Sequence, residues 1–130
     1  MAANENADLI REGYQAFQWM NLAAFGHILT DDCVWHVPGR GELAGVKNGR
    51  QAILEYYTDL GKLTGGTINI QLHDVVANEE HVVGLHHVSA KRAGKTVESM
   101  QAIVFHMRDG RVSEAWELLF NLYGMDEAFA

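Results

Sequence analysis

The stretch D-D-C-V-W-H-V-P-G-R-G-E-L-A-G, residues 31–45, decides the fold, because it separates a helical beginning from a later part that is mostly sheet. Residues 33–37 are apolar and rich in β-formers, and they predict a strand. Pro38 has no N–H to donate to a neighbouring strand, so Pro38-Gly39 predicts the end of that strand or a turn at a sheet edge. We therefore expect a loop to begin at Pro38.

Two helices are predicted before this strand. Over residues 7–20, the apolar positions at helical spacing are Leu9, Ile10, Gly13, Tyr14, Ala16, Phe17 and Met20. Asn21 predicts the N-cap of a second, shorter helix that ends at residues 30–32. The apolar face of this second helix comprises Leu22, Phe25, Ile28 and Leu29.

A third helix and four strands are predicted after Gly45. The helix K-N-G-R-Q-A-I-L-E-Y-Y-T-D-L-G-K-L has one face comprising Ala52, Ile53, Tyr56, Tyr57, Leu60 and Leu63. From residue 67 the apolar period falls to two, and turn signals divide the chain into strands near residues 67–77, 81–91, 96–108 and 111–120. Connections this short require antiparallel neighbours, so we expect a meander. Residues 121–130 predict a turn or short helix over the sheet.

The composition predicts one soluble domain over residues 1–130. The formal net charge of −7 argues against binding to nucleic acid or to an anionic membrane.

Cys33 has no partner for an internal disulfide, and no leader or long apolar run is present, so we expect a cytoplasmic protein. The seven histidines show no metal-ligand spacing, and the glycines after Pro38 do not match a nucleotide-binding motif. We expect no metal and no cofactor.

Helices followed by a run of antiparallel strands indicate the α+β class, with helices covering one face of the sheet. A curved sheet wrapped around helices leaves a cavity between the two layers. Because small molecules bind in such cavities, the fold predicts a pocket but not its use.

Several motifs carry a resemblance to a known family. They are Ala16-Phe17, L-T-D-D-C-V-W-H-V-P-G, L-A-G, G-R-Q-A-I-L, L-H-D-V and F-H-M-R-D-G-R-V-S-E-A-W-E. In these the chain resembles the SnoaL-like and ketosteroid-isomerase-like branch of the nuclear transport factor 2-like superfamily. The resemblance implies a cone-shaped α+β fold, a curved antiparallel sheet around N-terminal helices, and a homodimer through the outer sheet face. The superfamily includes isomerases, cyclases, epoxide hydrolases, dehydratases and domains without known chemistry.

The resemblance also assigns candidate residues. Tyr14 matches the helical tyrosine of steroid isomerases, but Val37 and Ile103 stand where those enzymes carry a base and an oxyanion-holding acid, which argues against classical steroid isomerisation. In SnoaL-like cyclases and epoxide hydrolases a carboxylate on the last strand points into the cone, and that position is Glu117. The arginine and aspartate that epoxide hydrolases need on the middle strand have no match in residues 85–89.

Together these arguments predict a small apolar ligand and three catalytic residues. Glu117 would transfer a proton, because a buried carboxyl has a raised pKa, while Tyr14 and His86 would hold an oxyanion. His86 is preferred to His87 because it shares strand parity with Gly84 and Val88, and by the same parity His36 faces away from the cone. The expected substrate-binding residues are Trp35, Val37, Phe17, Tyr57, Ile103 and Gln101.

Other interpretations stay open at this stage. The candidate side chains could be ordinary core residues, and the protein a ligand-binding or dimeric interaction module without turnover. A second alternative is an epoxide hydrolase-type activity.

Overall fold

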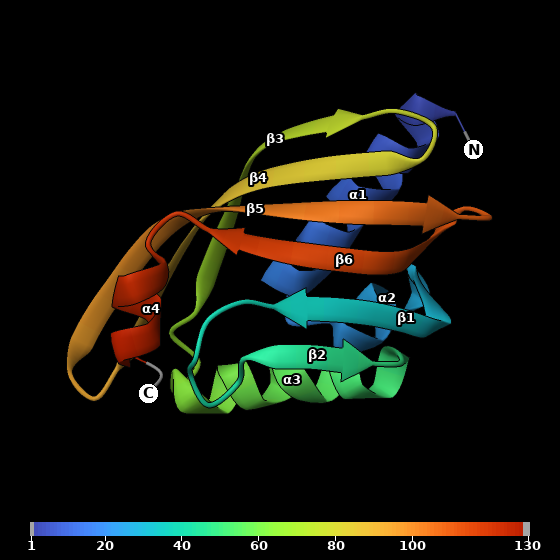
Figure 1. Cartoon of the computed structure of the whole chain (residues 1–130). Helices are drawn as coiled ribbons and strands as arrows, with labels where there is room; N and C mark the ends of the chain where they lie inside the picture. Colours follow the sequence, from blue (N-terminus) through green and yellow to red (C-terminus); the bar gives the residue numbers. More distant parts are fainter. Residues whose placement is uncertain (1, 129–130) are drawn as a thin grey trace.

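The computed structural model describes residues 2–128 and contains one curved six-stranded sheet (Figure 1). The strand order across the sheet is β2-β1-β6-β5-β4-β3. The strands are β1 (Leu29–Val37), β2 (Gly45–Asn48), β3 (Asn69–Ala77), β4 (His81–Arg92), β5 (Lys95–Arg108) and β6 (Arg111–Leu119). The predicted α+β class is therefore confirmed.

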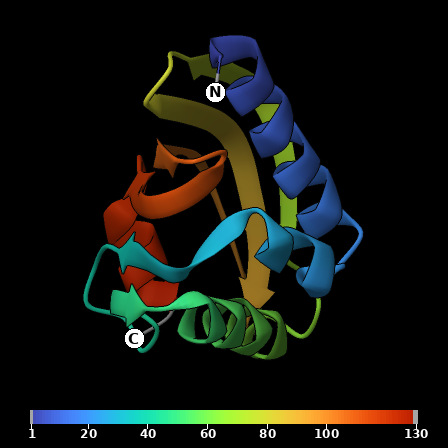
Figure 2. The ribbon, with the colours of Figure 1, turned by 90° about the vertical axis from the view of Figure 1, so that its right-hand side faces the viewer.

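The helices are α1 (Ala3–Gln18), α2 (Leu22–His27), α3 (Arg50–Leu63) and α4 (Leu122–Ala128). The first three pack on one side of the sheet, and Figure 2 shows α1 and α3 along two sides of the molecule with the strands closing the others. The predicted C-terminal helix is present as α4, which contacts β5 at the end of the sheet away from α2 (Figure 1). None of the helices in residues 2–128 is long and apolar enough to span a membrane.

The four C-terminal strands form the predicted antiparallel meander. The sheet as a whole is mixed, however, because β1 pairs with β6 in parallel. The expectation of a purely antiparallel sheet was therefore wrong for this pair. A parallel pair needs a long connection, and here the connection from β1 to β6 includes α3 and the four strands β2 to β5.

The boundaries around the second helix also differ from the prediction. Ile28 and Leu29 were expected to continue the helix, but α2 ends at His27 and β1 already begins at Leu29. Val112 N–H donates to the Ile28 carbonyl over 2.8 Å, and Leu29 pairs with Val112, so pairing with a distant strand overrides the local helical pattern. Strand β2 was not predicted, and Lys47 and Asn48 were wrongly included in the stretch assigned to the third helix, which begins at Arg50. The four residues of β2 show no clear alternation, and they form a strand because they pair with β1.

Gly84 on β4 allows α1 to approach the sheet closely. A Cβ atom at this position would lie 2.5 Å from the hydroxyl oxygen of Tyr14 and 2.7 Å from its ring. Only a residue without a side chain leaves Tyr14 in its place, with its hydroxyl 2.7 Å from His86 Nδ1.

We predict that Gly84→Ala lowers the free energy of unfolding by about 1–3 kcal/mol, because the added methyl overpacks the contact between α1 and β4. Denaturant unfolding measures the change. Gly61→Ala is the matched control, since a Cβ there meets only Met20 Cε at 3.9 Å and a helical alanine should stabilise α3 by about 0.5–1 kcal/mol. Equal stability of Gly84→Ala and the unsubstituted chain would contradict the close approach.

Candidate functional site

A cavity of about 90 Å³ lies between α3 and the concave face of the sheet. Its apolar walls include Val37, Leu43, Leu60, Ile68, Ile70, Val88, Ile103 and Leu119. Its polar residues include Tyr56, Tyr57, His86, Gln101 and Glu117. The loop at residues 38–44 and Asp126 of α4 also contribute to the lining, and the two are joined by a 2.9 Å hydrogen bond from Arg40 N–H to the Asp126 carboxylate.

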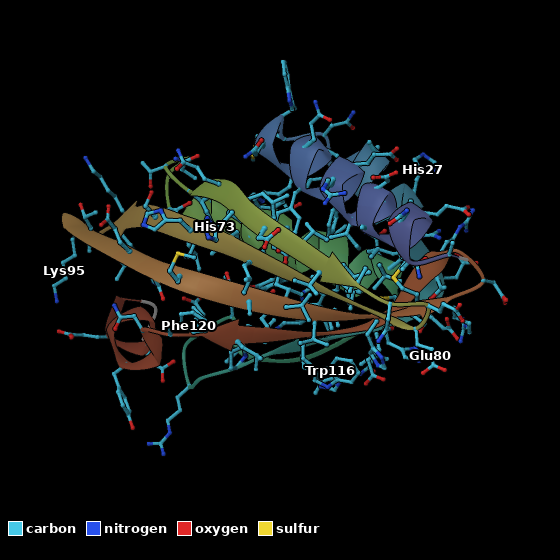
Figure 3. All side chains as sticks on the ribbon, turned by 90° about the horizontal axis from the view of Figure 1, so that it is seen from above. His27, His73, Glu80, Lys95, Trp116 and Phe120 are labelled. Atoms are coloured by element: carbon cyan, nitrogen blue, oxygen red, sulfur yellow. The ribbon has the colours of Figure 1, made fainter. Side chains whose placement is uncertain are left out.

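Glu117 is the buried charged group of this cavity. It lies on β6 opposite Ile103 of β5, and it is only 5 % exposed. Its neighbour Trp116 lies on the opposite face of the sheet, which is the face turned away from α1 in Figure 3. Strand alternation therefore directs Glu117 inward, as the family resemblance implied.

Four donors bind the Glu117 carboxylate. Its Oε2 atom accepts from Trp35 Nε1 at 2.6 Å and from the Tyr57 hydroxyl at 3.0 Å. Its Oε1 atom accepts from Gln101 Nε2 at 2.8 Å and from the Tyr56 hydroxyl at 3.3 Å. A carboxylate offers about four lone-pair sites, so the ionised form is fully satisfied.

His86 and Tyr14 extend this network from the cavity lining to α1. Gln101 Oε1 lies 2.7 Å from His86 Nε2, and His86 Nδ1 lies 2.7 Å from the Tyr14 hydroxyl. His86 is completely buried, as its strand parity predicted, and His87 is partly exposed. Gln101 therefore connects His86 to Glu117, which do not hydrogen-bond to each other directly.

Burial sets the pKa values of this network. Desolvation raises the pKa of Glu117, and hydrogen bonds from Trp35, Tyr57, Gln101 and Tyr56 oppose that rise only in part. Desolvation also lowers the pKa of His86 to about 4, so its imidazole is neutral near pH 7. The pKa values of Tyr56 and Tyr57 are raised by burial and by the Glu117 charge, which keeps both hydroxyls as donors.

Three of the predicted site residues do not line the larger cavity. Tyr14, Phe17 and Trp35 line a second cavity of about 30 Å³, whose lining shares Tyr57, Ile70 and Ile103 with the larger one. The Tyr14 hydroxyl contacts His86 Nδ1, and the indole N–H of Trp35 donates to Glu117 Oε2. The catalytic role predicted for Tyr14 and the substrate-binding roles predicted for Phe17 and Trp35 stay predictions, and the structure places these side chains in the aromatic core next to the larger cavity.

The other predicted residues do line the larger cavity, namely Val37, Tyr57, Ile103, Gln101, His86 and Glu117. Tyr56 was missed as a site residue, although the sequence places it next to Tyr57 on the apolar face of α3. Gln101 was named as a ligand contact, but its link between Glu117 and His86 could not be seen in the sequence.

His36 lies on the outer face of the sheet, as its parity predicted. Its ring stacks on Trp116 at a centroid distance of 5.5 Å, and its Nε2 lies 2.7 Å from a Glu114 carboxylate oxygen. Cys33 is buried, and desolvation raises the pKa of its thiol to about 12, which makes it unreactive. Within residues 2–128 no three His, Cys, Asp or Glu side chains form a group that could hold a metal ion.

Comparisons with known proteins agree with this architecture. Residues 10–115 match the family described as the SnoaL-like domain. The uncharacterized protein Rv0034 of Mycobacterium tuberculosis (strain ATCC 25618 / H37Rv) is 30 % identical over 118 residues, which cover 90 % of this chain and 90 % of the relative.

Two solved structures extend the comparison to the fold. Bal32a, from a soil-derived mobile gene cassette, has a TM-score of 0.95 and 34 % identity, with 98 % of each chain covered. An NTF2-like protein (nuclear transport factor 2-like) from Burkholderia xenovorans LB400 has a TM-score of 0.85 and 18 % identity, covering 100 % of this chain and 99 % of its own. The second of these similarities concerns the fold alone.

The raised pKa of Glu117 predicts a pH-dependent stability. Below the unfolded value of about 4.5 the group is protonated in both states, and above it the folded state holds the proton longer. The quantity to compare is the free energy of unfolding of the unsubstituted protein minus that of the Glu117→Gln variant. We expect this difference to fall as pH rises from 4.5 to the pKa of Glu117 in the folded protein, and to stay constant at higher pH. Denaturant unfolding across this range measures the difference, and a difference that rises with pH would contradict the assignment.

Proposed function

We propose that this chain, which belongs to the SnoaL-like domain family, binds a small, largely apolar organic molecule and transfers a proton on it through Glu117, without a cofactor. The observation that carries the proposal is the position of Glu117, a buried carboxylate of raised pKa at an apolar cavity. A base of raised pKa is well matched to proton transfer near neutral pH.

The walls of the cavity support the choice of ligand. Most of the lining side chains are aliphatic or aromatic, so a ligand gains affinity mainly by burying apolar surface. A second anion beside Glu117 would be repelled in this low-dielectric setting. The ligand class that fits best is therefore a neutral, mostly hydrocarbon compound with one polar group.

The hydroxyls around Glu117 support a carbonyl as that polar group. When a C–H bond next to the carbonyl breaks, its proton goes to Glu117 and its electron pair moves to the carbonyl oxygen. Neutralised Glu117 no longer holds four donors as strongly, so the Tyr56 or Tyr57 hydroxyl can donate to the oxyanion on the ligand. In a β,γ-unsaturated ketone, return of the proton from Glu117 to the γ-carbon moves the double bond and completes an isomerisation. In a ligand with a second carbonyl, the enolate carbon can instead bond to that carbonyl carbon, and the resulting alkoxide takes the proton from Glu117, which closes a ring.

A second candidate function is ligand binding without turnover. It is favoured by the saturation of the Glu117 carboxylate by four donors, and by the aliphatic side chains of Val37 and Ile103 in the cavity. The same cavity would then hold the ligand while Glu117 served only to order the tyrosines.

Deuterium exchange into a ketone distinguishes the two functions. We expect the protein to bind cyclohexanone or 2-tetralone and to catalyse exchange of the α-hydrogens with D₂O, followed by NMR. Glu117→Gln should lose about 10²- to 10⁴-fold in exchange rate, because it lacks the base, while it still binds the ketone.

Glu114→Gln is the matched control, since it removes a carboxylate from the same strand on the outer face of the sheet. It should exchange at the unsubstituted rate. Full exchange activity in Glu117→Gln would contradict the role of Glu117. Binding of the ketones without exchange by the unsubstituted protein would favour the second candidate function.

A further inference from the structure

A chain of three hydrogen bonds joins four elements of the fold at this site. It runs from Tyr14 on α1 through His86 on β4 and Gln101 on β5 to Glu117 on β6. Each link is 2.7 or 2.8 Å long, and all four residues are buried. Tyr14 and His86 reach the carboxylate only through Gln101.

With Glu117 ionised, the chemistry of the groups sets the direction of every link. An ionised carboxylate only accepts, so Gln101 must turn its NH₂ group toward Glu117 and its carbonyl oxygen toward His86. His86 Nε2 must then carry the proton that is donated to Gln101. In a neutral imidazole this leaves Nδ1 as an acceptor, and the Tyr14 hydroxyl donates to it.

We infer that this one-directional chain holds Glu117 as an anion in the resting protein, and that Gln101, His86 and Tyr14 act as positioning residues of the site. The amide of Gln101 can donate to Glu117 because its oxygen is already engaged by His86. His86 can donate because Tyr14 occupies its other nitrogen. The positioning role of these residues in catalysis rests on the proposed function, whereas the direction of the hydrogen bonds does not.

The contacts around these hydrogen-bonded residues favour a positioning role over simple packing. A buried histidine needs partners for both nitrogens, and both partners here are polar side chains rather than backbone. Gly84 leaves the space that Tyr14 needs, and the Phe105 ring packs edge-on against Tyr14 at a centroid distance of 6.4 Å. The rotamers that form the chain are therefore held by their own contacts.

Other titratable groups face the carboxylate from neighbouring elements, and their influence must be separated from that of Gln101. Besides Glu117 itself, the titratable residues of the site are Tyr56 and Tyr57 on α3, His86 on β4, Tyr14 on α1 and Asp126 on α4. Gln101→Met removes both the donor to Glu117 and the acceptor of His86 Nε2–H. Loss of that acceptor lowers the pKa of His86 further below about 4, so His86 stays neutral and adds no charge near Glu117. A change in the titration of Glu117 in that variant can thus be assigned to the lost hydrogen bond.

The test is an NMR titration of the whole protein that does not depend on activity. Carbon-13 labelling of glutamate side chains gives the pKa of Glu117 directly, its signal being assigned by its loss in Glu117→Gln. In Gln101→Met we expect this pKa to rise by about one unit or more, since a hydrogen bond to the charged form is lost. Gln71→Met, an exposed glutamine on β3, is the control and should leave it unchanged.

Nitrogen-15 spectra of histidine give the second readout. In the unsubstituted protein His86 should carry its proton on Nε2 alone near neutral pH. In Glu117→Gln the amide can either donate or accept, so the direction is no longer fixed and protonation of Nδ1 should appear as well. This readout also serves if Gln101→Met fails to fold.

Two results would overturn the inference. One is an unchanged pKa of Glu117 in folded Gln101→Met, and the other is a proton on Nδ1 of His86 in the unsubstituted protein. Failure of the proposed function looks different, because it would abolish ketone exchange in every variant while leaving both NMR readouts as expected.

Discussion

The burial of one carboxylate is the constraint on which this structure depends. An ionised carboxyl removed from water without partners costs several kcal/mol, so Glu117 requires donors on every side. Those donors come from β1, α3 and β5, while the carboxylate itself stands on β6. The parallel pairing of β1 with β6 therefore brings Trp35 to Glu117, and the packing of α3 across the sheet brings Tyr56 and Tyr57 to the same carboxylate. A polar cluster that is fully satisfied can specify one arrangement of the layers.

An aromatic layer behind the site holds the donors in place. Tyr57 meets Trp35 at a centroid distance of 5.9 Å and Phe25 at 5.4 Å, both near perpendicular. Such edge-to-face contacts fix ring orientation as well as burying apolar area. The indole N–H of Trp35 and the hydroxyl of Tyr57 thus point at Glu117 with little freedom. Phe17 and Trp35, which were predicted to bind substrate, belong to this aromatic layer.

Strand alternation made much of the site predictable from the sequence. The inward position of His86 and the outward position of His36 follow from a period of two, whereas the inward position of Glu117 was implied by the resemblance to SnoaL-like cyclases and epoxide hydrolases. What could not be predicted depends on contacts between distant segments. Leu29 is strand because Val112 pairs with it, and Gln101 matters because it lies between two groups 15 and 16 residues away. Local sequence patterns do not reveal such contacts between distant segments.

The four donors to the Glu117 carboxylate are compatible with its proposed action as a base. The contact from Tyr56 is the longest of the four at 3.3 Å, and it is the one that can be released at least cost. In the proposed reaction, an apolar ligand that expels water from the cavity would raise the free-energy cost of the anion further and so make Glu117 a stronger base toward the C–H bond beside it. The network would then keep the carboxylate ordered and ionised while the site is empty, and give up its weakest donor to the ligand oxygen as charge moves there.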